Sequence, residues 1–316
     1  MKRRTLLSAA ALGVPAAAIL GATPAQASAT FSVVGTEQIL NRLMMWNKDT
    51  PFTDENLEWS WSPGVGGWFN LSDARFRHIP RVGEVALAAA SGGDVGIVEK
   101  KHGVREQDLD DLLWSASPGG NPHAAEYVHP VGAVVTASSS NGQVAGGYLC
   151  VYAPSHPRRI ETLEQVQVIP FKGAHGVLWD PAGDVLWAIG DKVVRAYEVA
   201  GERRDVRLVD TGRSVPLEGL GHDLQPDYSD LGKLFVTDTY GVHHIDKAAL
   251  TSASVSVEDS VKAYSRHRRG EDVSVRADLV GEKTWGSPTV RFSRSPWQTR
   301  EGAEFYKARI YTTAYQ

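Results

Sequence analysis

Short runs of apolar and β-branched residues recur along the chain, and turns of glycine, aspartate and proline separate them. In four consecutive units a second and a third run follow the first in the same order. They lie at residues 84–88 and 95–98, 133–137 and 148–152, 184–188 and 193–197, and 233–237 and 242–245. A more polar, alternating run ends each unit, as at residues 165–169 and 205–209. This pattern predicts units of four antiparallel strands.

A histidine stands at the start of the first strand in three of these units. In each case a turn of small residues leads to it, and the three residues are His123, His175 and His222. They are separated by 52 and 47 residues, so the histidine returns once per unit. Side chains at one repeat position converge on a common axis when the units close into a ring. We therefore expect the three imidazoles to meet at one mouth of a central channel.

Four-stranded units of about 40–50 residues are the building blocks of a β-propeller, so we predict an all-β fold with six blades. Seven blades is the alternative, because the unit that starts at residues 261–264 is short. We expect the last blade to combine C-terminal strands at residues 288–292 and 303–309 with N-terminal strands at 31–34 and 42–45. Pairing both ends in one sheet leaves no open edge. A β-sandwich is the competing fold for the same runs.

The N-terminal segment predicts export. Residues 1–27 combine a basic start, an apolar run and an Ala-Gln-Ala cleavage signal, as a secretory signal peptide does. The Arg-Arg-Thr-Leu-Leu start is typical of a twin-arginine signal, with a general secretory signal as the alternative. We expect residues 28–316 to form a single propeller domain, secreted as an extracellular monomer. No other stretch reaches the run of about 18 apolar residues that crosses a bilayer.

Charge and cysteine content narrow the classes of partner. The formal net charge is −4, and removal of residues 1–27, which hold three basic and no acidic residues, takes it to −7. A mildly acidic protein has no general attraction for nucleic acid or for an anionic membrane, so we expect neither as a partner. The single cysteine, Cys150, lies in an apolar run and forms no internal disulfide. Stability must therefore come from a buried core.

The three histidines are the first candidates for chemistry. Imidazoles that converge at a channel mouth can act as general base and acid near neutral pH. They can also coordinate a divalent metal ion such as zinc, manganese, iron or nickel. The alternative is structural, with each histidine capping its turn through hydrogen bonds to the backbone. We predict His123, His175 and His222 as catalytic residues and as candidate metal ligands.

Other polar and aromatic residues are predicted near the same rim. Arginine matches a planar carboxylate through paired N–H donors, and tyrosine and tryptophan offer flat faces that stack on sugar rings. The candidate ligand-binding residues are Asp73, Arg75, Arg77, Glu126, Asp223, Lys262, Tyr264, Trp285 and Arg291. Three further tryptophans, Trp59, Trp61 and Trp68, are expected to pack between blades instead.

Four motifs carry a resemblance to known proteins. Residues 119–123, 173–181, 221–226 and 305–309 resemble a group of secreted bacterial β-propeller proteins of unassigned function. More distantly, the arrangement is similar to propeller-type polysaccharide lyases, such as oligogalacturonate lyase and rhamnose–glucuronate lyase. That resemblance implies histidines at the channel mouth, with a metal or an arginine holding a uronate carboxylate. No local motif of these lyases matches residue by residue.

Two functions follow as expectations. In the first, the protein is a secreted carbohydrate-active enzyme that acts on an extracellular oligo- or polysaccharide, as a polysaccharide lyase on uronate-containing glycans. His175 or His222 would be the base, and Arg75, Arg77 or a bound metal would stabilise the developing charge. A glycoside hydrolase is a variant of this idea. In the second, the propeller is a non-catalytic module that binds a sugar, a peptide or another protein.

Overall fold

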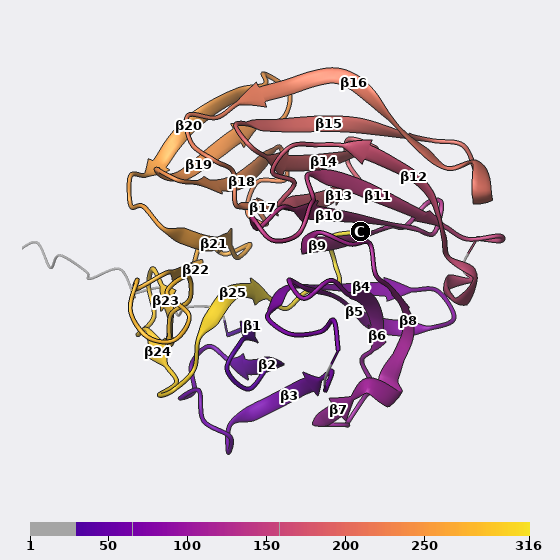
Figure 1. Cartoon of the computed structure of the whole chain (residues 1–316). Helices are drawn as coiled ribbons and strands as arrows, with labels where there is room; N and C mark the ends of the chain where they lie inside the picture. The colour runs from indigo at the N-terminus through magenta and orange to yellow at the C-terminus, as the bar shows by residue number, and fades with distance from the viewer. Residues whose placement is uncertain (1–29, 65, 158) are drawn as a thin grey trace, which may run out of the picture.

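Six β-sheets surround a central channel in the computed structural model, which describes residues 30–316 except Val65 and Arg158 (Figure 1). The protein is thus an all-β propeller with six blades, as the repeat predicts. Helix in the described residues is limited to three 3₁₀ turns, η1 (Leu109–Asp111), η2 (Ile160–Thr162) and η3 (Arg203–Asp205). No helix in these ranges is long and apolar enough to span a bilayer. The predicted signal peptide lies outside the described residues.

Five blades are built from strands that follow chain order from the channel outward. They are β4 (Leu71–Ile79), β5 (Gly83–Ala90), β6 (Val95–Glu99) and β8 (Leu112–Ala116); β9 (Asn121–Val128), β10 (Ala133–Ser139), β11 (Tyr148–Ala153) and β12 (Glu164–Pro170); β13 (Gly176–Asp180), β14 (Val185–Gly190), β15 (Val193–Ala200) and β16 (Arg207–Pro216); β17 (Asp223–Pro226), β18 (Lys233–Asp238), β19 (Gly241–Asp246) and β20 (Thr251–Ser256); and β21 (Val261–Arg266), β22 (Asp272–Arg276), β23 (Thr289–Phe292) and β24 (Gln298–Thr299).

The sixth blade joins the two ends of the described chain. Its strands, from the channel outward, are β25 (Phe305–Ile310), β1 (Ser32–Glu37), β2 (Arg42–Asn47), β3 (Leu57–Ser62) and β7 (Glu106–Asp108). β25 pairs antiparallel with β1, with Arg309 opposite Val34. The predicted closure is confirmed, but the assignment of residues 288–292 to this blade is wrong. They form β23, where Phe292 pairs with Val273 and supplies the third strand that the short fifth unit needs.

Close packing of an aromatic ring against a glycine fixes the closing blade. Phe305 is fully buried and meets Trp46 and Phe52 edge-on, at ring-centroid distances of 6.0 and 6.5 Å. A Cβ atom on Gly35 would lie only 2.5 Å from the Phe305 ring. Glycine is required at this position because the innermost strand carries a large side chain across it.

The blades pack against one another through apolar faces, as the sequence predicts for the tryptophans. Trp59, Trp61 and Trp68 belong to one buried cluster that spans the closing blade and the β4 blade. Cys150 is 1% exposed, and burial raises the pKa of its thiol to about 11. The thiol is therefore protonated and serves as a small apolar side chain, since only the thiolate is a strong nucleophile.

The innermost strands of the six blades contact their neighbours in a closed ring, in the order β4, β9, β13, β17, β21, β25. The segment after β25 covers one end of the channel, and the C-terminus lies near its centre (Figure 1). There Tyr315 donates to Asp180 Oδ1 at 3.1 Å, and Gln316 Oε1 accepts from the His78 amide at 2.6 Å. The other end of the channel holds the histidines.

Candidate functional site

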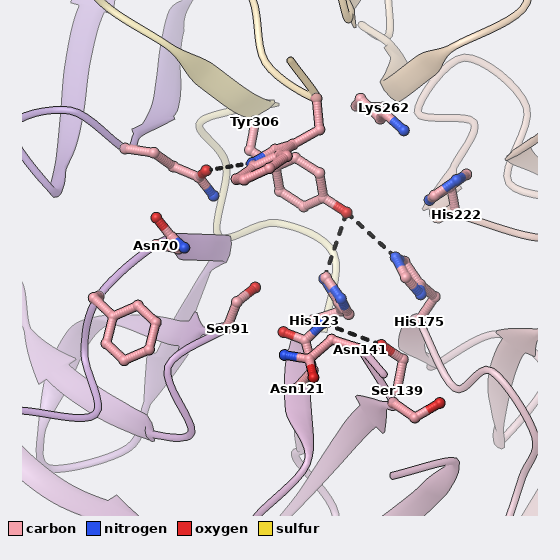
Figure 2. Close-up of a pocket in the computed structure, with 14 residues that line it drawn as sticks. Asn70, Ser91, Asn121, His123, Ser139, Asn141, His175, His222, Lys262 and Tyr306 are labelled. Atoms are coloured by element: carbon pink, nitrogen blue, oxygen red, sulfur yellow. Dashed lines mark hydrogen bonds between the residues drawn. The ribbon is translucent and has the colours of Figure 1, made fainter. Parts of the chain in front are cut away.

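The three histidine rings meet at one mouth of the channel (Figure 2). His123 and His175 stack at a centroid distance of 3.8 Å, and His175 meets His222 edge-on at 4.8 Å. Two of them are fixed by the backbone at the start of a blade, because the His175 amide donates to Ile189 O and the His222 amide donates to Thr237 O. The repeat spacing therefore brings these side chains together, as predicted.

Tyr306, which sequence reasoning missed, contacts two of the histidines through its hydroxyl group. Its hydroxyl is 3.3 Å from His175 Nε2 and 3.4 Å from His123 Nδ1. It comes from β25, so the closing blade contributes to the site. Burial, together with the carboxylates of Asp223 and Asp73, raises the pKa of this phenol well above its usual value. The phenol is therefore protonated at neutral pH and can donate a hydrogen bond.

The mouth forms a pocket of about 360 Å³. Most of the lining residues have polar side chains, and two aromatic side chains at the rim, Phe69 and Trp285, are 56% and 42% exposed. Besides the histidines and Tyr306, the lining residues are Gln38, Phe69, Asn70, Ser91, Asn121, Ser139, Ser140, Asn141, Lys262 and Trp285. No aspartate or glutamate is among these residues. The pocket can therefore accept an anionic ligand without meeting a carboxylate of the same charge.

Burial and neighbouring cations hold the histidines neutral. The pKa values of His123 and His175 lie well below the ordinary value, chiefly because burial disfavours the charged ring, and Lys307 and Lys262 add repulsion. The same causes lower the pKa of His222 to about 3. Burial also lowers the pKa of Lys262, which has no ion-pair partner in the described part of the chain. The mouth thus presents neutral imidazoles beside an uncompensated ammonium group.

A network of charged side chains fills the channel beneath the pocket. Arg309 binds Asp223 through two hydrogen bonds of 2.6 and 2.8 Å, and its Nε donates to Asp73 at 2.9 Å. Arg77 binds Glu126 through two hydrogen bonds of 2.9 and 2.6 Å. Lys307 Nζ lies 3.2 Å from His123 O, directly below the histidines, and 3.5 Å from Asp223. These groups lie deeper in the channel than the residues that line the pocket.

Five residues of this network do not lie where the sequence predicts them. Asp73, Arg75, Arg77, Glu126 and Asp223 were expected at the rim, but each is less than 5% exposed and none lines the pocket. The physical reason is the length of the inner strands. Every second residue of a strand faces the channel about 6.6 Å deeper than the last, so Arg75 and Arg77 on β4 lie below the mouth. Hydrogen bonds from arginines hold Glu126 and Asp223 inside the channel.

The remaining predicted residues divide into two groups. Lys262 and Trp285 line the pocket, and Trp285 Nε1 donates to Gln38 Oε1 at 2.8 Å. Tyr264 and Arg291 do not line it. Tyr264 packs on Phe235 at a centroid distance of 4.8 Å, and Arg291 binds Glu258 at 2.7 Å on the outer part of its blade.

The arrangement does not form the metal site that the sequence suggested. Within residues 30–316, apart from Val65 and Arg158, no group of three or more His, Cys, Asp or Glu side chains is placed to hold a metal ion. The stacked rings of His123 and His175, inclined by 15°, direct their nitrogen lone pairs along nearly parallel planes. Ligands of one ion must instead point toward a shared centre.

Six blades closed by the C-terminal strand, with a pocket of histidines and a tyrosine at one end of the channel, define the protein as a β-propeller with a candidate site at its mouth. The chain belongs to the family of unknown function DUF6528, which matches residues 51–312. This agrees with the resemblance to propellers of unassigned function. No curated protein matches the chain significantly.

Solved structures with the same fold differ widely in sequence. A functionally unknown protein from Desulfotomaculum acetoxidans is 13% identical, with a TM-score of 0.55, and the match covers 90% of this chain and 80% of that one. A protein from Bacteroides fragilis, provisionally described as a 6-phosphogluconolactonase, is 12% identical, with a TM-score of 0.56 and coverage of 92% and 100%. The WD40 propeller domain of Doa1 is 12% identical, with a TM-score of 0.51 and coverage of 88% and 82%. At this identity the likeness shows the fold alone.

Proposed function

We propose that the protein binds a uronate-containing oligo- or polysaccharide at the histidine mouth and cleaves it by β-elimination. The observation that carries the proposal is the combination of neutral imidazoles, a protonated Tyr306 and the uncompensated Lys262 in one pocket whose lining lacks carboxylates. An anionic sugar fits such a pocket, because the ammonium group attracts it and the imidazoles and amides offer hydrogen bonds. The signal-peptide pattern of residues 1–27 supports an extracellular location.

The roles follow from position and protonation state. His175 is the base, because its ring is neutral and touches both Tyr306 and His222. Lys262 takes the role that the sequence analysis gave to Arg75, Arg77 or a metal, since both arginines are held in the channel network. Its positive charge beside the substrate carboxylate stabilises the charge that develops as the neighbouring proton leaves.

The proposed step is balanced within the pocket. His175 removes the proton from the carbon next to the uronate carboxylate, and the electrons of that C–H bond form a carbon–carbon double bond. The C–O bond to the neighbouring sugar breaks, and the leaving oxygen takes a proton from the Tyr306 phenol. The His175 imidazolium then returns a proton to the phenolate over the 3.3 Å contact between Nε2 and the tyrosine oxygen. Both side chains thus regain their starting states.

The test is incubation of the purified protein with a panel of uronate-containing glycans, with detection of the ultraviolet absorbance of the conjugated product. We expect a product from at least one glycan and its loss in a His175→Ala variant. The matched control is His102→Ala, since His102 is an exposed histidine outside the pocket. A panel that yields no absorbing product contradicts cleavage. A glycoside hydrolase is not proposed, because most such enzymes use a pair of carboxyl groups that this lining lacks.

Non-catalytic recognition of an anionic sugar is the second candidate, and the low histidine pKa values favour it. A base whose pKa lies far below the working pH accepts a proton weakly. Phe69 and Trp285, both exposed at the rim, offer stacking faces that binding alone would use. This reading predicts that uronate-containing glycans bind and are recovered intact.

A further inference from the structure

The pocket has two chemically different sides. Lys262 and His222 lie together at one side, and Asn70 and Ser91 lie at the opposite side (Figure 2). After burial itself, Lys262 is the largest influence that lowers the pKa of His222, which agrees with their proximity. The side chains of Asn70 and Ser91 are uncharged. Among the lining residues the lysine ammonium, that of Lys262, is on one side only.

Excess positive charge extends into the channel below the pocket. The channel network holds four basic groups, Arg75, Arg77, Lys307 and Arg309, against the three carboxylates of Asp73, Glu126 and Asp223. Lys262 adds a further cation with no carboxylate partner in the described ranges. An unpaired charge in a partly buried place is costly, and a ligand anion would offset that cost.

Two buried polar atoms at the pocket have no hydrogen-bond partner. They are His222 Nδ1 on the cationic side and Asn121 Oδ1 near the amide side. Unpaired buried polar groups are uncommon, and a bound water or ligand is one way to satisfy them. Asn121 Nδ2 is directed to Ser139 Oγ at 3.4 Å, so its oxygen is the atom left to accept from a hydroxyl group. The two unpaired atoms therefore lie on different sides of the pocket, and Asn121 Oδ1 is the one that can accept from a hydroxyl group.

The amide side is arranged to bind hydroxyl groups. Lys283 Nζ donates to Asn70 Oδ1 at 3.0 Å, so the Asn70 amide offers its N–H groups to a ligand. Asn121 offers an acceptor through Oδ1, and the Ser91 hydroxyl can do either. Uncharged donors and acceptors suit the hydroxyl groups of a sugar better than they suit its carboxylate.

We propose that the pocket binds one hexuronate ring in a single orientation, with Lys262 and His222 holding its carboxylate and Asn70 and Asn121 holding its hydroxyl groups on the opposite side. The inference rests on the proposed function in taking a uronate sugar as the occupant. It adds a specificity determinant, because a neutral hexose of the same size cannot use the Lys262 side. It also places the carboxylate beside His222, whose ring contacts the ring of His175, the proposed base.

The test compares matched sugars by titration calorimetry. The probes are the methyl glycosides of glucuronate and galacturonate, each with its neutral hexoside, and the variants are Lys262→Gln, Lys262→Arg and Asn121→Ala. We expect Lys262→Gln to weaken uronate binding about 10-fold or more, with little effect on the neutral hexoside. Lys262→Arg should keep the preference for uronate, and Asn121→Ala should weaken both sugars by a similar factor. The control is Lys172→Gln, since Lys172 is 85% exposed and lies outside the pocket.

The outcomes separate this inference from cleavage. Unchanged uronate binding in Lys262→Gln, or an equal loss in Lys172→Gln, would overturn the carboxylate subsite even if an absorbing product forms. A 6-sulfated hexoside that binds as tightly as the uronate would overturn the assignment to a carboxylate. Uronate-selective binding that depends on Lys262, without any absorbing product, would support the subsite and contradict the elimination.

Discussion

Arg309 and Asp223 form a buried ion pair with two hydrogen bonds, of 2.6 and 2.8 Å, although 86 residues separate them. Arg309 belongs to β25, the last strand, and Asp223 begins β17, so the pair joins the closing blade to the blade two positions away in the ring. The arginine also contacts Asp73 on β4 at 2.7 Å. The guanidinium holds the pKa of Asp223 well below its usual range. One side chain thus links three blades at the axis.

We predict that Arg309→Met destabilises the protein by about 3–5 kcal/mol, because it leaves two buried carboxylates without their main partner. The free energy of unfolding in urea measures this. Arg159→Met is the control, since Arg159 pairs with Glu161 at the surface and its side chain is 62% exposed. That variant should change stability by less than about 0.5 kcal/mol. Equal urea midpoints for the two variants would contradict a structural role for the network.

A second prediction concerns closure of the ring. Deleting residues 302–316 removes β25, the innermost strand of the closing blade, and exposes the edge of β1. We expect the truncated protein to lose its cooperative melting transition and to aggregate, since an unpaired edge and the apolar face around Trp46 become accessible. Thermal melting and solubility measurements check this. A truncated protein that keeps the melting temperature of the full chain would show that β25 is dispensable.

The repeat made the fold and the histidine cluster predictable from sequence. His123, His175 and His222 recur once per blade, and a ring turns equal positions in the repeat into neighbours in space. The assignment of residues 288–292 failed because strands in adjacent blades have similar patterns. Only pairing partners, here Phe292 with Val273, decide to which sheet such a strand belongs.

The sequence did not predict how deep in the channel each inward-facing side chain lies. Arg75 and Arg77 were expected at the rim but lie on the inner strand β4, and the sequence does not say how far each is from the mouth. Partners from other blades decide it, since Arg77 binds Glu126 49 residues away. Tyr306 was missed for a related reason. Its blade is assembled from both ends of the chain, so no uninterrupted repeat marks it as the counterpart of the histidines.

The third prediction is acid sensitivity that depends on His222. The folded-state pKa of His222 is about 3, whereas an unfolded histidine titrates near 6.5. Below about pH 6.5 the unfolded chain gains a proton that the folded protein does not bind, so stability falls as the pH falls. Between pH 7 and pH 5 we expect His222→Gln to lose about 2 kcal/mol less stability than the natural protein. Urea unfolding at both pH values measures this, with a substitution of the exposed His102, His102→Gln, as the matched control.

The fourth prediction tests Tyr306 as the acid. Tyr306→Phe removes only the hydroxyl that contacts His123 and His175, so the ring packing of β25 should survive. We expect kcat on a cleaved uronate glycan to fall by about 10²-fold or more, because the leaving oxygen loses its proton donor. KM should change little, since the lost interaction acts in the transition state. A variant whose KM rises while kcat is unchanged would assign Tyr306 to binding instead.

The last prediction is proton uptake on ligand binding. Burial and the nearby Lys262 and Lys307 keep His175 and His222 neutral in the free protein. A carboxylate bound beside them partly cancels the repulsion from the lysines, which raises the pKa of both imidazoles. Binding of a uronate should therefore take up a fraction of a proton, and this fraction should grow as the pH is lowered from about 7.5 to 5.5. Titration calorimetry in two buffers of different ionisation enthalpy measures the number of protons. His222→Gln should reduce it, and uptake that is zero at both pH values would contradict a carboxylate next to the histidines.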